Sequence, residues 1–100
     1  MTLTIQSIHF TASDRLKNYV QRKTDKLDQF FDRIVDAKVN LKLHNDGKGA
    51  NKVVEVKLAV PGDILIASEK GSTFEEATDL VTDKIKKQLR RYKERIRSRA

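Results

Sequence analysis

The side chains in this sequence that are best suited to chemistry are the basic residues crowded near its C-terminus. Between Lys84 and Arg99 there are nine Lys and Arg residues and a single acid, Glu94, so the segment carries a net charge of +8. The rest of the chain has 12 basic and 13 acidic residues, so the overall charge of +7 arises from this one segment. Such a concentration of positive charge is typical of a surface that binds a polyanion.

These basic residues take definite positions around a helix. At about 100° per residue, an apolar stripe from Val81 to Ile96 marks the face that packs on the core. One flank of the stripe has Lys84, Arg91 and Arg95, the other has Lys86, Lys93 and Arg97, and Lys87 and Arg90 lie near the outer face. Ordinary surface helices mix acids with bases so that i,i+4 pairs form. The near absence of acids here therefore favours polyanion binding over a merely solvated face.

An earlier amphipathic segment contributes more basic residues. Arg22 and Lys26 fall on one flank of it, and Lys23 lies within its apolar stripe. Two interpretations of Lys23 stay open: its stem covers the core while its ammonium reaches water, or it contacts a phosphate. If the two helices lie side by side, their basic flanks line a groove, but the sequence leaves open which flank of the second helix faces inward.

Catalytic and metal-binding chemistry has little support. The chain has no Cys, and its two His residues, His9 and His44, are far apart in the sequence. Gly47-Lys48-Gly49 falls in a predicted hairpin loop, unlike a Gly-rich phosphate loop that precedes a helix. We therefore expect no enzyme, no metal site, no cofactor and no small-molecule substrate.

The elements that position the basic residues follow from hydrophobic periodicity. Alternation at the N-terminus predicts a strand that ends or bulges near Ser7. Helical spacing predicts a helix over 13–31, capped by Ser13 or Thr11. Three further strands are predicted over 37–43, 54–60 and 64–68, separated by a hairpin loop at 45–51 and a turn at 61–63. Capping boxes Thr73/Glu76 or Ser72/Glu75 predict the start of the second helix, whose end frays from about residue 96.

This order predicts an α+β fold, βαβββα, as a single domain over 1–100. Each strand has one apolar face and each helix one apolar stripe, which favours a four-stranded mixed sheet with two roughly parallel helices on one face. The helical crossover makes the first two strands parallel, and this connection is expected to be right-handed. The two hairpins make the remaining strand pairs antiparallel. The other face of the sheet carries Lys38, Lys42, Glu55 and Lys57 with no aromatic residue. We therefore expect contacts to phosphate and sugar that follow RNA shape more than base sequence.

The sequence also resembles a known family over essentially its whole length. The similarity is carried by Leu3-x-Ile5, Leu16, Val20, Lys23, Lys26-Leu27, Phe31-Asp32-Arg33-Ile34, Ala67-Ser68, Gly71, Ala77-x-Asp79, Asp83-Lys84-Ile85-x-x-Gln88-Leu89, Arg91, Lys93, Arg95 and Arg97. In order and spacing these resemble the ribosome hibernation-promoting factor and ribosome-associated inhibitor A family. Because the chain stops at Ala100, without the C-terminal dimerising domain of the long form, it is most similar to the short form.

This resemblance implies a translation inhibitor that binds the small ribosomal subunit under stress or in stationary phase. Because the sequence shows no signal peptide and no apolar run long enough to span a bilayer, we expect a cytoplasmic location. The inhibitor would occupy the groove of messenger and transfer RNA, idle the ribosome, and be monomeric when free. The resemblance implies RNA contacts at Lys23, Lys26, Lys84, Lys87, Arg91, Lys93, Arg95 and Arg97, and the helical positions add Arg22, Lys86 and Arg90.

Two other functions stay open. A general double-stranded RNA-binding module also places helices on one face of a sheet, usually in αβββα order. A protein-interaction or membrane-surface role for the basic helix is the second alternative. Because that helix has no exposed Trp or Phe among its charges, we expect no membrane binding.

Overall fold

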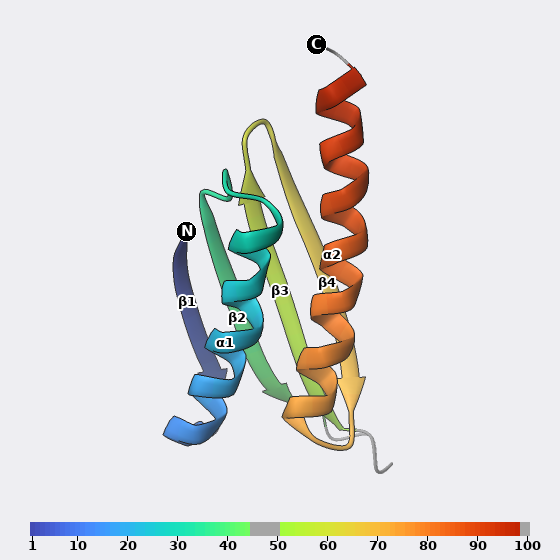
Figure 1. The fold of residues 1–100 in the computed structure, drawn as a ribbon. Coiled ribbons are helices and arrows are strands. Elements are labelled where there is room, and N and C mark those ends of the chain that lie inside the picture. The colour runs from blue at the N-terminus through green and yellow to red at the C-terminus, as the bar shows by residue number, and fades with distance from the viewer. Residues whose placement is uncertain (45–50, 99–100) are drawn as a thin grey trace.

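The computed structural model describes residues 1–44 and 51–98 as one four-stranded sheet covered on one face by two helices (Figure 1). The elements in chain order are β1 (Thr2–Ile8), α1 (Asp14–Phe30), β2 (Asp36–Leu43), β3 (Lys52–Val60), β4 (Asp63–Gly71) and α2 (Phe74–Ser98). The predicted α+β fold with βαβββα order is therefore confirmed.

The pairing of the strands also agrees with the prediction. The sheet order is β1-β2-β3-β4; β1 pairs with β2 in parallel, and the other two pairs are antiparallel. The hairpin loop predicted at 45–51 joins β2 to β3, where the His44 amide donates to the Asn51 carbonyl oxygen at 2.8 Å. Residues 45–50 of that loop lie outside the described residues.

The core lies between the sheet and the helices because the apolar residues of every element point there. Val39 in β2 and Val56 in β3 are paired in register, and both are buried. Val20 of α1 and Ile85 and Leu89 of α2 cover them and are fully buried. Burying a side chain of this size stabilises the fold by roughly 1.5–3 kcal/mol, so this layer fixes which face of each helix turns inward.

The structure identifies the residues that cap the two helices and the residue at which the first strand ends. Ser13 caps α1 by accepting a hydrogen bond from the Leu16 amide at 3.1 Å. Thr73 caps α2 by accepting from the Glu76 amide at 3.0 Å. The first strand runs one residue past Ser7 and ends at Ile8; the next residue, His9, has a φ of +66° that turns the chain out of the sheet.

Two glycines occupy positions that disfavour other residues, one because of its backbone conformation and one because of a close contact. Gly62, in the turn between β3 and β4, has a φ of +78°, as the third position of a type II turn requires. Gly71 ends β4 directly below the start of α2, where an added Cβ would lie 2.9 Å from the Ala77 amide nitrogen. This close approach brings α2 back over the sheet immediately after the strand.

Both helices run in the same direction across the sheet, as predicted, and the last turns of α2 extend past the turn between β3 and β4 (Figure 1). The helix continues through Ser98, and fraying from about residue 96 stays a prediction. Residues 99–100, and with them Arg99, lie outside the described residues. In the ranges 1–44 and 51–98, neither helix has the length and apolarity needed to cross a bilayer.

Candidate nucleic-acid interface

One basic flank of α2 faces α1 across the groove between the helices. Lys86 lines a cavity of about 80 Å³ there together with Lys23 and Lys26 of α1. About two turns beyond Lys86 along α2, the Lys93 ammonium donates to the Phe30 carbonyl oxygen at 3.1 Å. The structure therefore answers the question that the sequence left open: the flank of Lys86, Lys93 and Arg97 is the inner one.

The opposite flank of α2 lies along the edge strand β4. Lys84 Nζ is 2.6 Å from Glu69 Oε1 and 3.4 Å from the Ser68 carbonyl oxygen. Arg95 Nη2 is 3.1 Å from Asp63 Oδ2. Between them, Gln88 Nε2 donates to the Ile66 carbonyl oxygen at 2.9 Å, and Arg91 is exposed beside Leu65. Two of the three bases on this flank are thus engaged with the strand.

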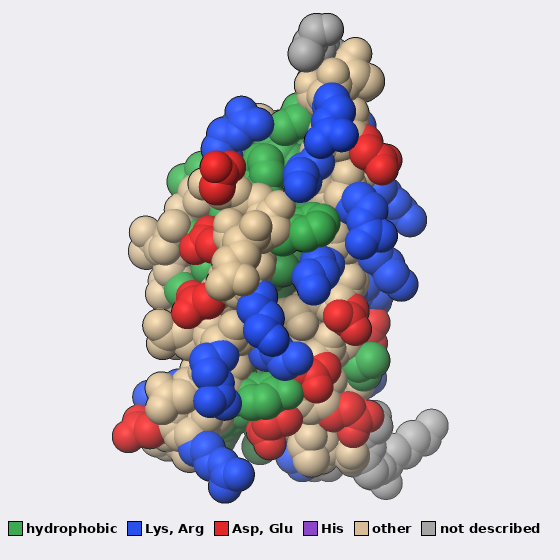
Figure 2. Space-filling model, viewed as in Figure 1, with side chains coloured by type: hydrophobic (Ala, Val, Ile, Leu, Met, Phe, Trp, Pro, Cys, Tyr) green, Lys and Arg blue, Asp and Glu red, His purple; other side chains and the backbone are tan. Residues whose placement is uncertain are grey.

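The outer face of α2 carries Lys87 and Arg90, both exposed. In the part of the chain that the structure describes, neither of them forms an ion pair with a carboxylate. Figure 2 shows basic side chains running along α2 and between the two helices, with acidic side chains over α1 and toward the start of α2. The positive surface is therefore a band that follows α2 and its groove.

The α1 side of this band consists of Arg22, Lys23 and Lys26. Arg22 and Lys26 are exposed, and the Arg22 guanidinium lies 5.9 Å from the centre of the Tyr19 ring. Lys23 Nζ is 3.0 Å from Asp79 Oδ1 on α2. Lys23 therefore has a role that neither interpretation of the sequence included, because its charge joins the two helices.

Asp79 is the centre of this connection, since one of its oxygens serves two partners on α1. The Tyr19 hydroxyl donates to Asp79 Oδ1 at 2.7 Å, and Lys23 reaches the same atom. The hydrogen bond from Tyr19, followed by that from Lys23, lowers the pKa of the Asp79 carboxyl. The hydrogen bond to Asp79 in turn raises the pKa of Tyr19 and that of Lys23. We call these three residues the interhelix cluster.

Metal-binding geometry is absent from the described ranges, 1–44 and 51–98. No three His, Cys, Asp or Glu side chains there are grouped in a way that could hold a metal ion. The groups that the basic band itself presents are those of Lys and Arg, which bind anions.

A family model described as sigma 54 modulation protein / S30EA ribosomal protein matches residues 3–97. The chain belongs to this family. Among curated relatives, the ribosome hibernation promotion factor of Bacillus subtilis (strain 168) is 34% identical, and the match covers 96% of this chain and 50% of the relative. The factor of the same name from Deinococcus radiodurans is 35% identical over 84% of this chain and 44% of its own length. The chain spans about half the length of the curated relatives it matches.

Two solved structures share the fold of this chain. The N-terminal domain of Thermus thermophilus Protein Y has a TM-score of 0.78 at 26% identity, with 92% of this chain and 99% of that chain covered. A ribosomal subunit interface protein from Coxiella burnetii has a TM-score of 0.82 at 19% identity, with 93% and 98% covered, and its likeness concerns the fold alone.

Sequence reasoning found the basic residues of this S30EA chain and missed the acids that position some of them. Asp79 and Lys23 both belong to the motifs on which the family resemblance rests, and the structure joins them in an ion pair. Helical spacing alone places Tyr19 on the apolar stripe of α1, although a buried Tyr often keeps its hydroxyl near a polar partner. That preference was the one available signal for the interhelix cluster.

Proposed function

We propose that this chain binds the small ribosomal subunit through rRNA phosphates and blocks the groove used by messenger and transfer RNA. Family membership and the names of its relatives, ribosome hibernation promotion factors, support a role at the ribosome. The observation that carries the proposal is the band of Lys and Arg along α2 and its groove. The proposed contacts are Arg22, Lys23, Lys26, Lys84, Lys86, Lys87, Arg90, Arg91, Lys93, Arg95 and Arg97.

The mechanism that we propose is steric and electrostatic. Lys and Arg neutralise phosphates and release the counterions around RNA, which drives binding without base-specific contacts. At 1.5 Å per residue, the 25 residues of α2 extend for about 37 Å, so the helix presents a row of cations to several phosphates at once. An occupied decoding groove then excludes the translation substrates, and the ribosome idles.

Co-sedimentation with separated small and large ribosomal subunits tests this proposal, with a long random RNA duplex as competitor. We expect saturable one-to-one binding to the small subunit that the duplex does not abolish. Equal binding to both subunits would instead indicate a general structured-RNA module. So would binding to the small subunit that the duplex competitor abolishes.

A charge-matched pair of variants locates the contact. Lys87→Glu with Arg90→Glu reverses two exposed charges on α2, and we expect it to abolish co-sedimentation. Lys38→Glu with Lys57→Glu reverses two exposed charges on the other face of the sheet, where the two residues are paired in register. This control should bind like the wild type, and an equal loss in both variants would count against a helix-face interface.

A further inference from the structure

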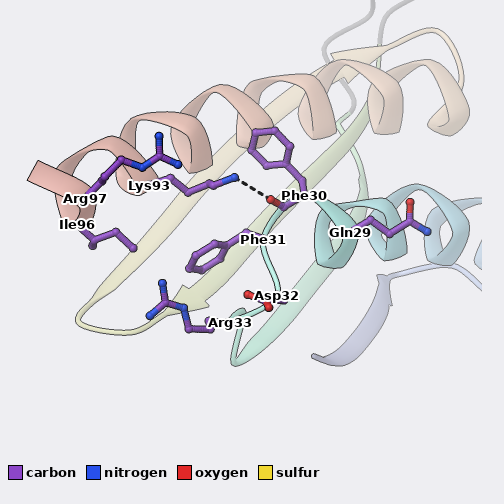
Figure 3. A pocket seen from close by; sticks show the side chains of 8 residues that line it. All are labelled: Gln29, Phe30, Phe31, Asp32, Arg33, Lys93, Ile96 and Arg97. Atoms are coloured by element: carbon purple, nitrogen blue, oxygen red, sulfur yellow. Dashed lines mark hydrogen bonds between the residues drawn. The ribbon is translucent and has the colours of Figure 1, made fainter. Parts of the chain in front are cut away.

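A second cavity lies where the C-terminal ends of the two helices meet, and it differs in chemistry from the rest of the basic band (Figure 3). Its volume is about 580 Å³, and it is lined by Phe30, Phe31 and Ile96 together with Arg33, Lys93 and Arg97. Phe30 and Phe31 come from the end of α1, whereas Lys93, Ile96 and Arg97 come from α2. The cavity thus combines apolar walls with three cations.

The apolar walls are flat and partly accessible. Phe31 is buried and packs edge-on against Tyr92, with ring centres 5.5 Å apart, so it forms a rigid floor. Phe30 and Ile96 are only partly buried. Figure 3 shows the Phe31 ring and the Ile96 side chain on opposite sides of the same space, with Phe30 above them toward α2. Such walls suit a planar, weakly polar group.

Two of the cations lie over the aromatic rings of the cavity. Lys93 Nζ lies 4.6 Å from the centre of the Phe30 ring and uses one hydrogen bond on the Phe30 carbonyl, which leaves further donors of the ammonium for a ligand. The Arg33 guanidinium lies 5.5 Å from the centre of the Phe31 ring. Asp32 also lines the cavity, so three cations face one carboxylate, and the net charge of the lining attracts an anion.

We propose that this cavity takes one unstacked nucleotide of an RNA strand, with its base against Phe30 and Ile96 and its phosphates on Arg33 and Arg97. A nucleotide has a planar base and a negatively charged phosphate. The lining offers apolar and aromatic side chains for the base and cations for the phosphate, and the volume suits a small ligand. An acidic peptide would satisfy the cations but make little use of the aromatic walls. The inference rests on the proposed RNA-binding function and adds a base-dependent contact to it.

The test compares two RNA hairpins that differ by one base. The first has a single bulged 2-aminopurine, and the second has an abasic ribose at the same position, so both carry the same phosphates. We expect the wild-type chain to bind the first roughly 5- to 100-fold more tightly, the usual contribution of one stacked base. The fluorescence of 2-aminopurine should change on binding, and the Ile96 methyl NMR signal should shift upfield.

Two variants separate base stacking from charge. Phe30→Leu keeps an apolar side chain and removes the ring, so it should lose the preference for the base while its affinity for the abasic hairpin stays unchanged. Arg97→Gln keeps the Phe30 ring and should weaken binding to both hairpins by the same factor. Equal wild-type affinity for the two hairpins, or a preference that survives Phe30→Leu, would overturn the proposal. So would an Ile96 signal that shifts with a glutamate-rich peptide and not with the bulged hairpin.

Small-subunit binding keeps this inference distinct from the proposed function. If the wild type binds the small subunit, we expect Phe30→Leu to bind it roughly 5- to 100-fold more weakly. Wild-type-like binding by Phe30→Leu would overturn the nucleotide cavity and leave the ribosomal function standing. A wild type that prefers the bulged hairpin but does not bind the small subunit would instead reject the ribosomal function and retain the cavity.

Discussion

The interhelix cluster shows how one carboxylate can set the spacing of two helices. Asp79 on α2 holds Tyr19 and Lys23 on α1, and these side chains face the same groove as the basic band. The side chain of Asp79 is 46% exposed and that of Lys23 is 31% exposed, so solvent screens the ion pair. We therefore expect the cluster to contribute about 1 kcal/mol to stability, mostly through its hydrogen bonds.

Asp79→Asn should lower the free energy of unfolding at pH 7 by up to about 1 kcal/mol, because the amide oxygen of Asn still accepts hydrogen bonds but lacks the charge that strengthens them. The pKa of Asp79 is lowered in the folded state from its ordinary value of 3.8. Its stabilisation is therefore fully present above about pH 4 and is lost as the pH falls through the lowered folded pKa. Urea unfolding of both proteins between pH 2 and pH 7 should show a difference that is constant near neutrality and vanishes in acid.

Asp83→Asn is the matched control for this measurement. Asp83 is an exposed Asp one turn along α2 that lines the groove, and it has no hydrogen bond to Tyr19. Its replacement should change stability little at any pH in that range. If the two Asn variants gave the same pH profile, the hydrogen bonds to Asp79 would not be the source of the effect.

At this scale the sequence predicts which residues carry charge, but it does not predict their partners. Lys23 and Asp79 lie 56 positions apart, and their contact depends on how α1 and α2 are placed on the sheet. The same holds for Arg95 and Asp63, which meet only because the last turns of α2 pass over the turn between β3 and β4. Helical periodicity gives a residue's angle on its own helix and nothing about the neighbouring element.

The two basic flanks of α2 differ in how many of their charges are already paired. On the flank along β4, Lys84 and Arg95 are paired with Glu69 and Asp63. A phosphate that recruited either base would have to replace an existing ion pair. On the inner flank, Lys86 faces the groove with Lys26 of α1 opposite it. We therefore expect the inner flank to contribute more to RNA binding than the flank along β4.

Two double alanine variants, each of which removes two positive charges, test this difference. Lys26→Ala with Lys86→Ala should make the slope of log K against log salt less steep by about 1.4 to 1.8, the value for two lost phosphate contacts. Lys84→Ala with Arg95→Ala should change the slope by less than about 1. The slopes can be measured from small-subunit binding titrations between 50 and 200 mM salt. Identical slopes for the two pairs would show that net charge alone, and not flank, decides binding.

The order of the elements could be predicted because each one carries its own pattern. Alternation in β2, β3 and β4 and the apolar stripes of α1 and α2 determine which face each element buries, and the hairpins determine antiparallel pairing. The strand boundaries were predicted less accurately than the order of the elements. β3 begins at Lys52 and β4 ends at Gly71, beyond the alternating apolar residues. Those outer residues are held by ladder hydrogen bonds with the neighbouring strand, which leave no signal in hydrophobicity.

The molecule as a whole is elongated, with extents of 49 × 25 × 17 Å, and its charge is spread along the long dimension of α2. Several phosphates can then be contacted together. If about six are neutralised, log K for the small subunit should fall with log salt at a slope of about −4 to −5. A slope between 0 and −2 would indicate binding through a few contacts and would contradict an extended phosphate interface.

The covered edge of β4 limits how copies of this protein can associate. Lys84 and Gln88 donate to the carbonyl oxygens of Ser68 and Ile66, groups that an incoming strand would otherwise use. A fibre grown by adding sheet to sheet needs two open edges on each molecule, because every copy must have a neighbour on either side. At β4 two of those carbonyl groups are already bonded, so β1 is the more open edge of the described sheet. Growth of such a fibre would have to break these bonds at every step, whereas a dimer that pairs β1 with β1 would leave them in place.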